Sequence, residues 1–562
     1  MAEQTRAGKT RAGKPAPEKT AAEKLGAIQH GYVFEGQAIA LGAAIVDGEV
    51  RPEAQVSLPL AMMNRHGLVA GATGTGKTVT LQMMSEQLSA AGVPVFLTDV
   101  KGDLSGLATP GEAGEKLLAR TSALGQEWRP AAFPVEFLAL GGDGSGVPVR
   151  ATVTSFGPLL LARVMELNET QESSLQLVFH FADRNGLELV DLKDLRAVIQ
   201  FLTSPQGKDG LAQLGGLSKA TAGVILRELV ALEAAGLDAF FGEPEFETSE
   251  LLRTAEDGRG VITCLELPTL QSRPLLFSTF LMWLLADLFE DLPEVGDPEK
   301  PKLVFFLDEA HLLFEDASDA FLDAITQTVR LIRSKGVGVF FVTQTPKDVP
   351  ADVLGQLANR VQHALRAFTP QDAKALKATV STFPVSDYDL EEVLTSAGIG
   401  EAVVTVTDEE GAPTPVALTR LRAPGSRMGP SDPSLVAGTA QASPLAPKYA
   451  TAVDNVTAFE KLGRAAAEQP APQGPGPSPA GAPTPPPLPS PNLERVPGQA
   501  PGPAPGRTDD GGMLGDVVGA LGGALGGALG GGLRSMARSV GTQLGRELVR
   551  GMFGTSSRRR RR

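Results

Sequence analysis

The sequence predicts an α/β fold with a central, mostly parallel β-sheet. Through the middle of the chain, short runs rich in β-branched and aromatic residues alternate with segments of helical pattern. Such alternation is typical of parallel strands joined by crossover helices. One run, Leu303–Leu307, is apolar throughout, as expected for a strand buried on both faces of a sheet. These observations place the packed core in the middle of the chain.

The expected elements follow in chain order. An apolar segment at Tyr32–Val46 predicts a short hairpin ahead of the core. The predicted strands are Gly67–Ala70, Val93–Thr98, Val261–Leu265, Leu303–Leu307, Val337–Val342 and Val361–Leu365. Apolar residues at helical spacing predict helices at Lys77–Ala90 and at about Ala317–Arg333. Between about 155 and 255 the same spacing recurs without a strand pattern, which predicts an all-helical insertion.

Composition divides the chain into four parts. Residues 1–25 are basic and polar and predict a disordered arm, and residues 26–430 carry the apolar pattern of a folded domain. Residues 431–510 become rich in proline and predict a disordered linker. Residues 511–562 combine a Gly-rich segment, a basic amphipathic helix at Leu533–Phe553 and a final run of arginines. We therefore expect one domain with disordered N- and C-terminal tails.

The charge of the chain is uneven. The part up to Ser431 carries 37 Lys/Arg and 56 Asp/Glu, whereas the part after it carries 14 and 9. An acidic body repels the phosphate backbone of nucleic acid at long range. Any contact with DNA is therefore expected in a basic channel or in the tails. This argues against a protein that coats DNA, but not against a ring that threads it.

The chain has a single cysteine, Cys264. It excludes a disulfide scaffold and a thiolate metal cluster, and it fits a reducing compartment. The first 24 residues are basic and polar and lack the apolar core of a secretory signal. We therefore expect a cytoplasmic protein.

A complete phosphate-binding loop follows the strand predicted at Gly67–Ala70. Its residues are Gly71, Ala72, Thr73, Gly74, Thr75, Gly76, Lys77 and Thr78. Glycines let backbone N–H groups wrap a phosphate, Lys77 supplies charge to the β- and γ-phosphates, and the Thr78 hydroxyl ligates Mg²⁺. A glycine loop without function is the alternative, but the mechanism requires this position between a strand and a helix. The loop predicts ATP and Mg²⁺ as cofactors.

Two carboxylates follow the buried strand Leu303–Leu307. Ligands of open α/β sheets bind at the carboxyl ends of the strands, where Asp308 and Glu309 are expected. Asp308 is the candidate to hold Mg²⁺ through a water, and Glu309 is the candidate to orient and deprotonate the attacking water. The alternative is an acidic cap for the next helix. A glutamate directly after the aspartate also argues against a kinase-type enzyme.

Other polar residues are expected at the same edge of the sheet. Gln344 follows the strand Val337–Val342 and is a candidate to contact the γ-phosphate or the attacking water, with a polar strand end as the alternative. Asp99 and Lys101 follow another predicted strand, where a structural loop is nearly as well supported. His311 has no metal-ligand spacing and is expected to form a hydrogen bond near the site.

Arginines on the helix before the Gln344 strand form a further candidate group. Arg330 and Arg333 cannot easily reach the nucleotide of their own subunit. One of them could act on a neighbouring subunit as an arginine finger, which would imply a ring. A solvated basic face is the alternative, and Arg360 and Arg366 are weaker candidates.

Five motifs carry a resemblance to a known family: Gly71–Thr78, Asp99–Ser105, Asn168–Ser173, Leu307–His311 and Arg333–Pro346. Together they resemble the HerA-like ATPases of the FtsK/HerA superfamily, and most of all the YjgR-type branch. The resemblance covers about residues 26–430 and implies hexameric rings of RecA-like P-loop domains that translocate double-stranded DNA. The chain before the loop is too short for the N-terminal β-barrel of HerA proper. The positions that match the family's functional residues are Lys77, Thr78, Asp308, Glu309, Gln344 and, for the inter-subunit arginine, Arg333.

Two functions remain open. The leading hypothesis is an ATP-hydrolysing motor, a homo-hexameric ring that translocates or remodels double-stranded DNA. The alternative is an ATPase that remodels or regulates proteins at a membrane surface through its C-terminal tail. Residues 533–562 would then contact an anionic membrane or nucleic acid, although a flexible solubilising tail is the plainer interpretation. The presence of Glu309 disfavours a nucleotide-binding scaffold without hydrolysis.

Overall fold

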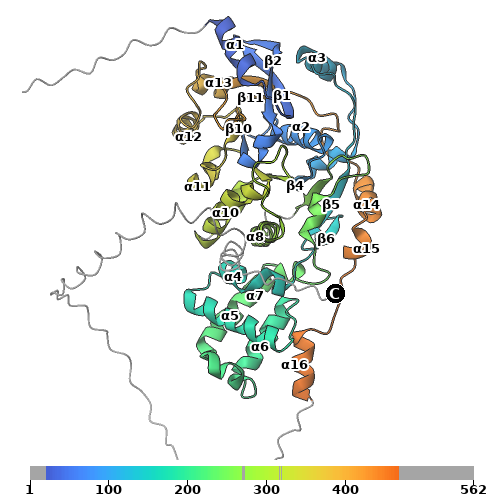
Figure 1. The fold of residues 1–562 in the computed structure, drawn as a ribbon, viewed down its shortest axis with the longest axis vertical. Coiled ribbons are helices and arrows are strands. Elements are labelled where there is room, and N and C mark those ends of the chain that lie inside the picture. The colour runs from blue at the N-terminus through green and yellow to red at the C-terminus, as the bar shows by residue number, and fades with distance from the viewer. Residues whose placement is uncertain (1–19, 143, 269–272, 316, 318, 468–562) are drawn as a thin grey trace, which may run out of the picture. The chain divides into compact units, whose positions relative to one another are not determined.

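The structure of the protein is a computed structural model that describes residues 20–467, apart from 143, 269–272, 316 and 318 (Figure 1). The predictions for residues 1–19 and 468–562 lie outside the described residues. These include the Gly-rich segment, the basic amphipathic helix and most of the linker. The predicted α/β class is confirmed, because helices and strands alternate around one large sheet (Figure 1).

Among the described residues, twelve strands form one sheet in the order β2-β1-β12-β11-β10-β3-β9-β8-β4-β7-β5-β6. Their bounds are β1 (Ala38–Val46), β2 (Glu49–Pro59), β3 (Gly67–Ala70), β4 (Val95–Asp99), β5 (Val135–Leu140), β6 (Val147–Val149), β7 (Ile262–Glu266), β8 (Leu303–Leu307), β9 (Val337–Thr343), β10 (Asn359–His363), β11 (Glu401–Thr405) and β12 (Ala417–Leu421). From β10 to β6 all neighbours pair parallel. The remaining pairs are antiparallel. The sheet is therefore mostly parallel, with an antiparallel extension at one side.

The helices connect these strands and cover the sheet (Figure 1). Their bounds are α1 (Ala21–Gly31), α2 (Lys77–Ala90), α3 (Glu115–Ala123), α4 (Val153–Val164), α5 (Glu169–Arg184), α6 (Leu192–Thr203), α7 (Lys219–Ala234), α8 (Pro274–Asp291), α9 (His311–Phe314), α10 (Asp319–Ile332), α11 (Ala351–Leu354), α12 (Pro370–Val380), α13 (Leu390–Ser396), α14 (Pro433–Ala442), α15 (Ala446–Tyr449) and α16 (Ala458–Ala467). Short 3₁₀ helices used below are η2 (Asp103–Ala108), η7 (Arg333–Lys335) and η8 (Pro346–Asp348). The helix predicted at Lys77–Ala90 has these same bounds in the structure.

Each face of the sheet has its own hydrophobic core. Successive side chains of a strand point to opposite faces, and β8 shows this directly. Phe305 packs in the core that contains α8 and α10, whereas Phe306 packs in the core that contains α2. Trp283 of α8 and Leu81 of α2 are fully buried on their respective faces. Burial on both faces explains why β8 is apolar throughout.

The range from about 155 to 255, predicted as an all-helical insertion, contains α4 to α7 and short 3₁₀ turns. α4 packs against α5 and α8, and α5 and α6 both pack against α7 (Figure 1). Within the described residues of this range no strand is present. The motif that begins at Asn168 starts α5, because the side chains of Asn168 and Gln171 each accept the other's backbone N–H. This capping box gives the motif a structural role.

The predicted boundary of the N-terminal arm is wrong. α1 begins at Ala21, within the range 1–25 that composition marks as disordered. Thr20 and Glu23 form a capping box that starts the helix, and Ile28 is buried against the sheet. Local capping and one apolar anchor therefore order a segment whose composition is mostly polar.

The predicted start of the linker at residue 431 is also wrong. Asp432 accepts the N–H of Ser434 and caps α14, which packs against β5 through the buried Val436. Tyr449 of α15 is fully buried, and its hydroxyl accepts the N–H of Glu247 at 3.1 Å. Helices α14 to α16 therefore extend the described fold beyond residue 430.

The predicted hairpin at Tyr32–Val46 is wrong in extent. This segment supplies one strand, β1, whose hairpin partner is β2. β2 was not predicted, because it lies at the edge of the sheet and exposes polar residues such as Glu49 and Glu53. Edge strands lack the continuous apolar run that marks a central strand.

Candidate nucleotide site

The predicted site residues other than Arg333 meet at the carboxyl edge of the parallel strands. The order β3-β9-β8-β4 brings four strand ends side by side. The phosphate-binding loop follows β3, Gln344 follows β9, Asp308 and Glu309 follow β8, and Asp99 ends β4. Because these strands are parallel, the residues converge on the edge where open α/β sheets bind ligands.

The phosphate-binding loop is anchored on both sides by neighbouring strands. The N–H of Gly71 donates to the carbonyl of Thr343, the last residue of β9, at 3.2 Å. The N–H of Ala72 donates to the carbonyl of Ala364, which follows β10, at 2.9 Å. The loop therefore has a fixed position between β9 and β10.

Glycine is required at two positions of this loop. Gly76 has a φ of 109°, a left-handed conformation that glycine adopts without strain. A Cβ at Gly71 would lie 2.4 Å from the Cβ of His363. His363 is buried beneath the loop, with its Nε2 3.0 Å from the Thr80 hydroxyl, and burial lowers its pKa to about 4. The ring is therefore neutral at physiological pH, and the sequence did not identify it.

The loop leaves backbone donors free for a ligand. The described structure has no hydrogen bond from the N–H groups of Gly74, Gly76, Lys77 and Thr78. The Lys77 ammonium donates to the carbonyl of Gly71 at 2.6 Å. Burial lowers the pKa of Lys77, and the charges of Glu309 and Asp308 oppose this shift. Free N–H groups at a helix N-terminus together with a half-buried ammonium suit a chain of phosphates.

Asp308 is fixed at the end of β8 by backbone contacts. Its N–H donates to the Thr98 hydroxyl of β4 at 2.7 Å, and its Oδ1 accepts the N–H of Glu309 at 2.9 Å. Burial raises the pKa of Asp308 to about 6, and the neighbouring charge of Glu309 adds to the shift. The charges of Lys101 and Lys77 oppose this shift, and a bound Mg²⁺ would add further positive charge beside the carboxylate.

Glu309 has an unusual backbone and a free carboxylate oxygen. Its φ of 49° is left-handed, which is uncommon for a residue other than glycine. The side chain is 9% exposed, and its Oε1 accepts a hydrogen bond from Lys101 at 2.6 Å. Among the described residues its Oε2 has no hydrogen-bond partner, although Nδ1 of His311 lies 3.4 Å away. Such an oxygen is a place for a water or a ligand.

Asp99 and Lys101 have different roles on one loop. The Asp99 carboxylate accepts the N–H groups of Gly102 at 2.7 Å and Leu104 at 3.0 Å. Burial raises the pKa of Asp99 to about 6. The interpretation as a structural loop therefore fits Asp99, whereas Lys101 reaches the site through Glu309.

Gln344 directly follows β9, the strand between β3 and β8, and its side chain is exposed. Its neighbours Thr343 and Thr345 both donate to the Asp348 carboxylate, at 2.8 and 2.9 Å. The charge of Asp348 also acts on Lys77. The sequence analysis missed Asp348, although the capping-box spacing of Thr345 and Asp348 could have indicated it.

Arg333 lies at the opposite edge of the sheet. It follows α10 and precedes β9, which places it at the amino ends of the strands. Its guanidinium is 3.8 Å from Asp297, and that carboxylate is 3.7 Å from Arg65. Burial and the charge of Arg65 lower the pKa of Arg333. The structure therefore does not bring Arg333 to the phosphate-binding loop of its own chain.

The residues fit Mg²⁺ when it binds together with a nucleotide. In the part of the chain that the structure describes, no group of three or more His, Cys, Asp or Glu side chains can hold a metal. Mg²⁺ typically binds one or two protein oxygens and completes its shell with phosphate oxygens and water. Thr78, in the first turn of α2, and Asp308 can provide those protein oxygens.

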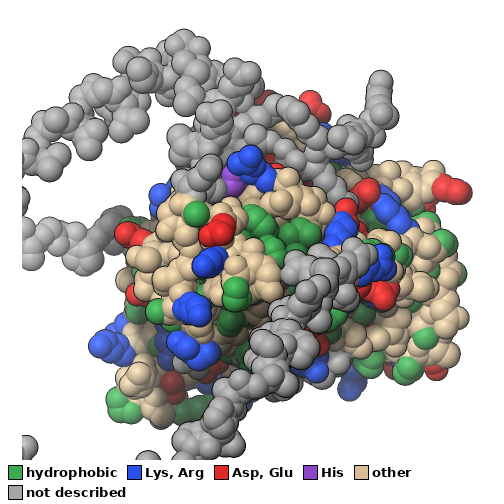
Figure 2. Space-filling view, turned by 90° about the horizontal axis from the view of Figure 1, so that it is seen from below, with side chains coloured by type: hydrophobic (Ala, Val, Ile, Leu, Met, Phe, Trp, Pro, Cys, Tyr) green, Lys and Arg blue, Asp and Glu red, His purple; other side chains and the backbone are tan. Residues whose placement is uncertain are grey.

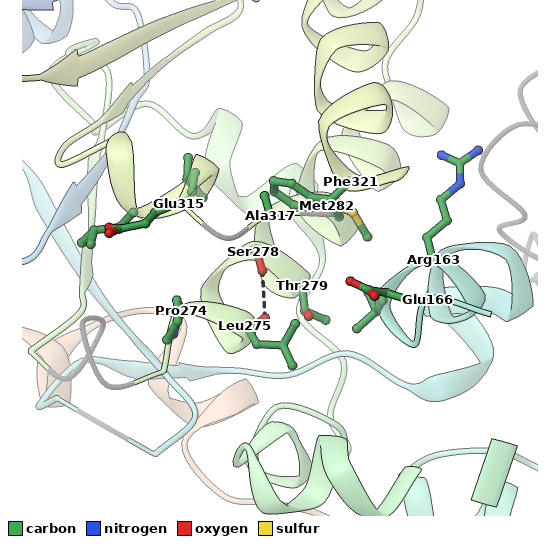
Figure 3. A pocket seen from close by; sticks show the side chains of 13 residues that line it. Arg163, Glu166, Pro274, Leu275, Ser278, Thr279, Met282, Glu315, Ala317 and Phe321 are labelled. Carbon is green, nitrogen blue, oxygen red and sulfur yellow. Dashed lines mark hydrogen bonds between the residues drawn. The ribbon is translucent and has the colours of Figure 1, made fainter. Parts of the chain in front are cut away.

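A second pocket lies between α4, α8, α9 and α10 (Figure 3). Figure 3 shows Glu166 of the α4 end on one side of it and Glu315, after α9, on the other. The Thr279 hydroxyl of α8 is buried there and has no partner within the described residues. The residues of the phosphate-binding loop do not line this pocket. It is therefore separate from the nucleotide site.

The family model described as helicase HerA-like, C-terminal, matches residues 45–562. No curated protein matches the chain. The bacterial conjugative coupling protein TrwBdeltaN70, in its unbound form, is 15% identical over 72% of this chain and 94% of that chain, with a TM-score of 0.46. The plasmid coupling protein TrwB in complex with ADP and Mg²⁺ is 16% identical over 70% and 97%, with a TM-score of 0.45. VirB4 of Thermoanaerobacter pseudethanolicus is 13% identical over 70% and 98%, with a TM-score of 0.43.

Proposed function

We propose that this chain, which belongs to the HerA-like helicase C-terminal family of P-loop ATPases, is a motor that couples hydrolysis of Mg-ATP to movement on double-stranded DNA. We further propose that it acts as a homo-hexameric ring in the cytoplasm. Membership of the family rests on the match over residues 45–562. The finer function rests on the arguments that follow.

The observation that carries the ATPase is the meeting of Lys77, Asp308 and Glu309 at one edge of the sheet. The free N–H groups of the loop and the Lys77 ammonium bind the phosphates. Asp308 and Thr78 orient Mg²⁺, which neutralises charge on the phosphate oxygens when bound. The unpartnered Oε2 of Glu309 accepts the proton of the attacking water. Gln344, beside them, contacts the γ-phosphate or that water.

The position of Arg333 supports a ring. It stands at the amino edge of the sheet, whereas the loop stands at the carboxyl edge. In a ring, the edge of one subunit can face the nucleotide of the next. An arginine supplied in this way stabilises charge that develops on the transferred phosphoryl group. We therefore assign Arg333 to the neighbouring subunit's site.

Positive charge is the requirement for a DNA track. On the face shown in Figure 2, lysine and arginine side chains are interspersed with aspartate and glutamate, and hydrophobic side chains lie between them. An interspersed surface gives no broad positive field. We therefore expect the DNA to contact a channel that forms only when subunits assemble.

The alternative function is an ATPase that acts on proteins at a membrane surface through residues 533–562. Within the described residues, no helix is long and apolar enough to cross a membrane. This alternative therefore depends on surface binding by the basic tail. It predicts that hydrolysis does not respond to DNA.

The test is the steady-state rate of ATP hydrolysis with and without double-stranded DNA, at low and at moderate salt, with Glu309→Gln as the blank. A DNA motor shows stimulation that falls as salt rises, because phosphate contacts release counterions. A rate that ignores DNA at both salt concentrations contradicts the motor. Anionic vesicles in place of DNA then test the alternative.

A deletion separates the body from the tail. Removal of residues 468–562 retains α14 to α16, which belong to the described fold, and is therefore preferable to removal from residue 431. If the ring threads DNA through the body, stimulation by DNA persists in this variant. If the tail recruits the partner, stimulation is lost while basal hydrolysis continues.

A further inference from the structure

Lys101 makes the closest charged contact to the proposed catalytic base. Its Nζ is 2.6 Å from Oε1 of Glu309. The Glu309 side chain is 9% exposed, whereas that of Lys101 is 51% exposed. A lysine at the surface therefore contacts a carboxylate that is buried. The contact raises the pKa of Lys101, mainly through the hydrogen bond to Glu309, so the lysine stays charged at neutral pH.

The loop that carries Lys101 is built to hold it in place. Asp99 accepts two backbone N–H groups of this loop, from Gly102 and Leu104. The hydroxyl of Ser105 donates to the carbonyl of Gly102 at 2.7 Å. These bonds fix both sides of Lys101 relative to the end of β4. Since β4 pairs with β8, the lysine is also fixed relative to Glu309.

The charges of two ammonium groups, those of Lys77 and Lys101, act on Asp308, but the two lysines have different hydrogen-bond partners. Lys77 donates to the carbonyl of Gly71 in the phosphate-binding loop, and its proposed role is to bind the phosphates. Lys101 is the one bonded to Glu309. We therefore assign Lys101 to holding the Glu309 carboxylate and not to binding the nucleotide.

The contact also distinguishes the two oxygens of Glu309. Oε1 is occupied by Lys101, whereas Oε2 has no hydrogen bond among the described residues. A general base must direct one oxygen to the proton it removes. The Lys101 contact leaves Oε2 as that oxygen, with Nδ1 of His311 3.4 Å from it.

We propose that Lys101 is a positioning residue for ATP hydrolysis, which holds the Glu309 carboxylate by Oε1 and so directs Oε2 to the attacking water. This inference rests on the proposed ATPase function. In the step, the water oxygen forms a bond to the γ-phosphorus, and the bond from that phosphorus to the β,γ-bridging oxygen breaks. ADP and phosphate are released, and the water proton passes to Oε2. Lys101 keeps its protons throughout.

The experiment compares the full-length variants Lys101→Met and Lys101→Arg with wild type. Lys101→Met removes the charge and keeps much of the length, so kcat falls by about 10- to 100-fold, within the range for general-base catalysis. The KM for ATP changes by less than about threefold, because the phosphate contacts of Lys77 remain. Lys101→Arg keeps the charge and a donor for Oε1 and therefore restores most of kcat.

Two controls make the result decisive. Lys116→Met removes an exposed lysine of α3 and leaves kcat unchanged. Glu309→Gln is measured in parallel, because its retention of activity would overturn the proposed function itself. If Glu309→Gln is inactive while Lys101→Met keeps wild-type kcat, only the role of Lys101 is refuted. A higher kcat in Lys101→Met also refutes it, because the contact would then restrain the base.

Discussion

The two edges of the parallel sheet differ in how their buried polar groups are satisfied. At the carboxyl edge, Asp308 has a pKa raised by burial and Glu309 keeps one oxygen without a hydrogen bond in the described structure. At the amino edge, His66 is bonded at both nitrogens, to the carbonyl of Val329 at 2.7 Å and the N–H of Val339 at 3.0 Å. The Glu309 carboxylate therefore keeps bonding capacity for a ligand, whereas His66 uses its own within the fold, although the buried amide of Asn64 at the same edge has no partner among the described residues.

Asn359 completes the network of the amino edge. Its amide nitrogen donates to the carbonyls of Met62 and His66, both at 2.9 Å, and its amide oxygen accepts the N–H of Thr407 at 3.0 Å. Buried polar groups that are fully bonded stabilise a fold, whereas incompletely bonded ones mark functional sites. Arg333, although predicted as catalytic, lies at the same edge as these bonded residues. A catalytic role for Arg333, as we propose it, therefore requires a second subunit.

The largest expected effect concerns Arg333. If it acts as a finger on the neighbouring subunit, Arg333→Ala lowers ATP turnover by about 10³-fold or more. Arg330→Ala, which removes an exposed arginine in the last turn of α10, three residues before Arg333, is the matched control and keeps turnover near wild type. Steady-state hydrolysis is measured together with the assembly state by sedimentation. A drop of only about tenfold in an intact assembly would assign Arg333 to a solvated basic face.

The second-largest effect is a loss of ATP affinity, which is expected for a lysine of the carboxyl edge but not for a lysine outside the site. Lys77→Ala removes a charge-assisted contact to phosphate, so ATP affinity falls by roughly 10- to 100-fold. Lys300→Ala removes an exposed lysine that donates to the carbonyl of Ala91, and it leaves ATP affinity unchanged. Equilibrium titration with a fluorescent ATP analogue measures both. Equal losses of ATP affinity in the two variants would contradict a specific role of Lys77 at the carboxyl edge.

A smaller effect is expected on stability at the amino edge. Asn359→Ala removes the side-chain bonds to the carbonyls of Met62 and His66 and to the N–H of Thr407, while the backbone N–H of residue 359 still donates to His66. We expect the free energy of unfolding to fall by about 2 kcal/mol. Asn185→Ala removes an exposed asparagine that bonds only the carbonyl of Phe181, and it costs less. Denaturant unfolding gives both values. If Asn359→Ala unfolds at the wild-type midpoint, the network is not structural.

The smallest effect at neutral pH becomes visible on acidification, when two buried groups, His66 and Asp308, act in opposite directions. Burial lowers the pKa of His66 to about 4, below its value in the unfolded chain, so its contribution to stability is lost as the pH falls from about 6.5 to 4. Burial raises the pKa of Asp308 to about 6, so the folded state binds the proton more readily and gains stability as the pH falls from about 6 to 4.

Melting temperatures across this pH window test both signs. His66→Gln is expected to flatten the loss of stability in acid, whereas Asp308→Asn is expected to steepen it. Parallel curves for the two variants and wild type would show that neither group titrates as described. The comparison uses the change with pH, so it does not depend on the stability of each variant at pH 7.

The central strands could be predicted from sequence because they are buried on both faces. β3, β8 and β9 are continuous apolar runs, and their predicted positions agree closely with the structure. β12 was missed because its side chains alternate between buried and partly exposed positions. β5 was missed for another reason. Its Glu136 is buried and paired with Arg253 at 2.8 Å, so a charged residue interrupts the apolar run of a core strand.

The site could be predicted only where its residues are close in sequence or follow a strand. Lys77, Asp308 and Glu309 belong to local motifs with a fixed geometry. The contact between Lys101 and Glu309 joins residues 208 positions apart, and it depends on the pairing of β4 with β8. His363 beneath the loop depends in the same way on the pairing of β10 with β3. Both contacts depend on the order of the strands, which local sequence patterns do not reveal.

The most direct test of the account is the rate of Mg-ATP hydrolysis by Glu309→Gln relative to wild type, at a saturating ATP concentration verified by titration. The account predicts a loss of about 10³-fold with ATP affinity retained, because the amide cannot accept the water proton while the phosphate-binding loop is unchanged. Turnover equal to wild type would contradict the assignment of Glu309, and with it the carboxyl edge as the site of hydrolysis.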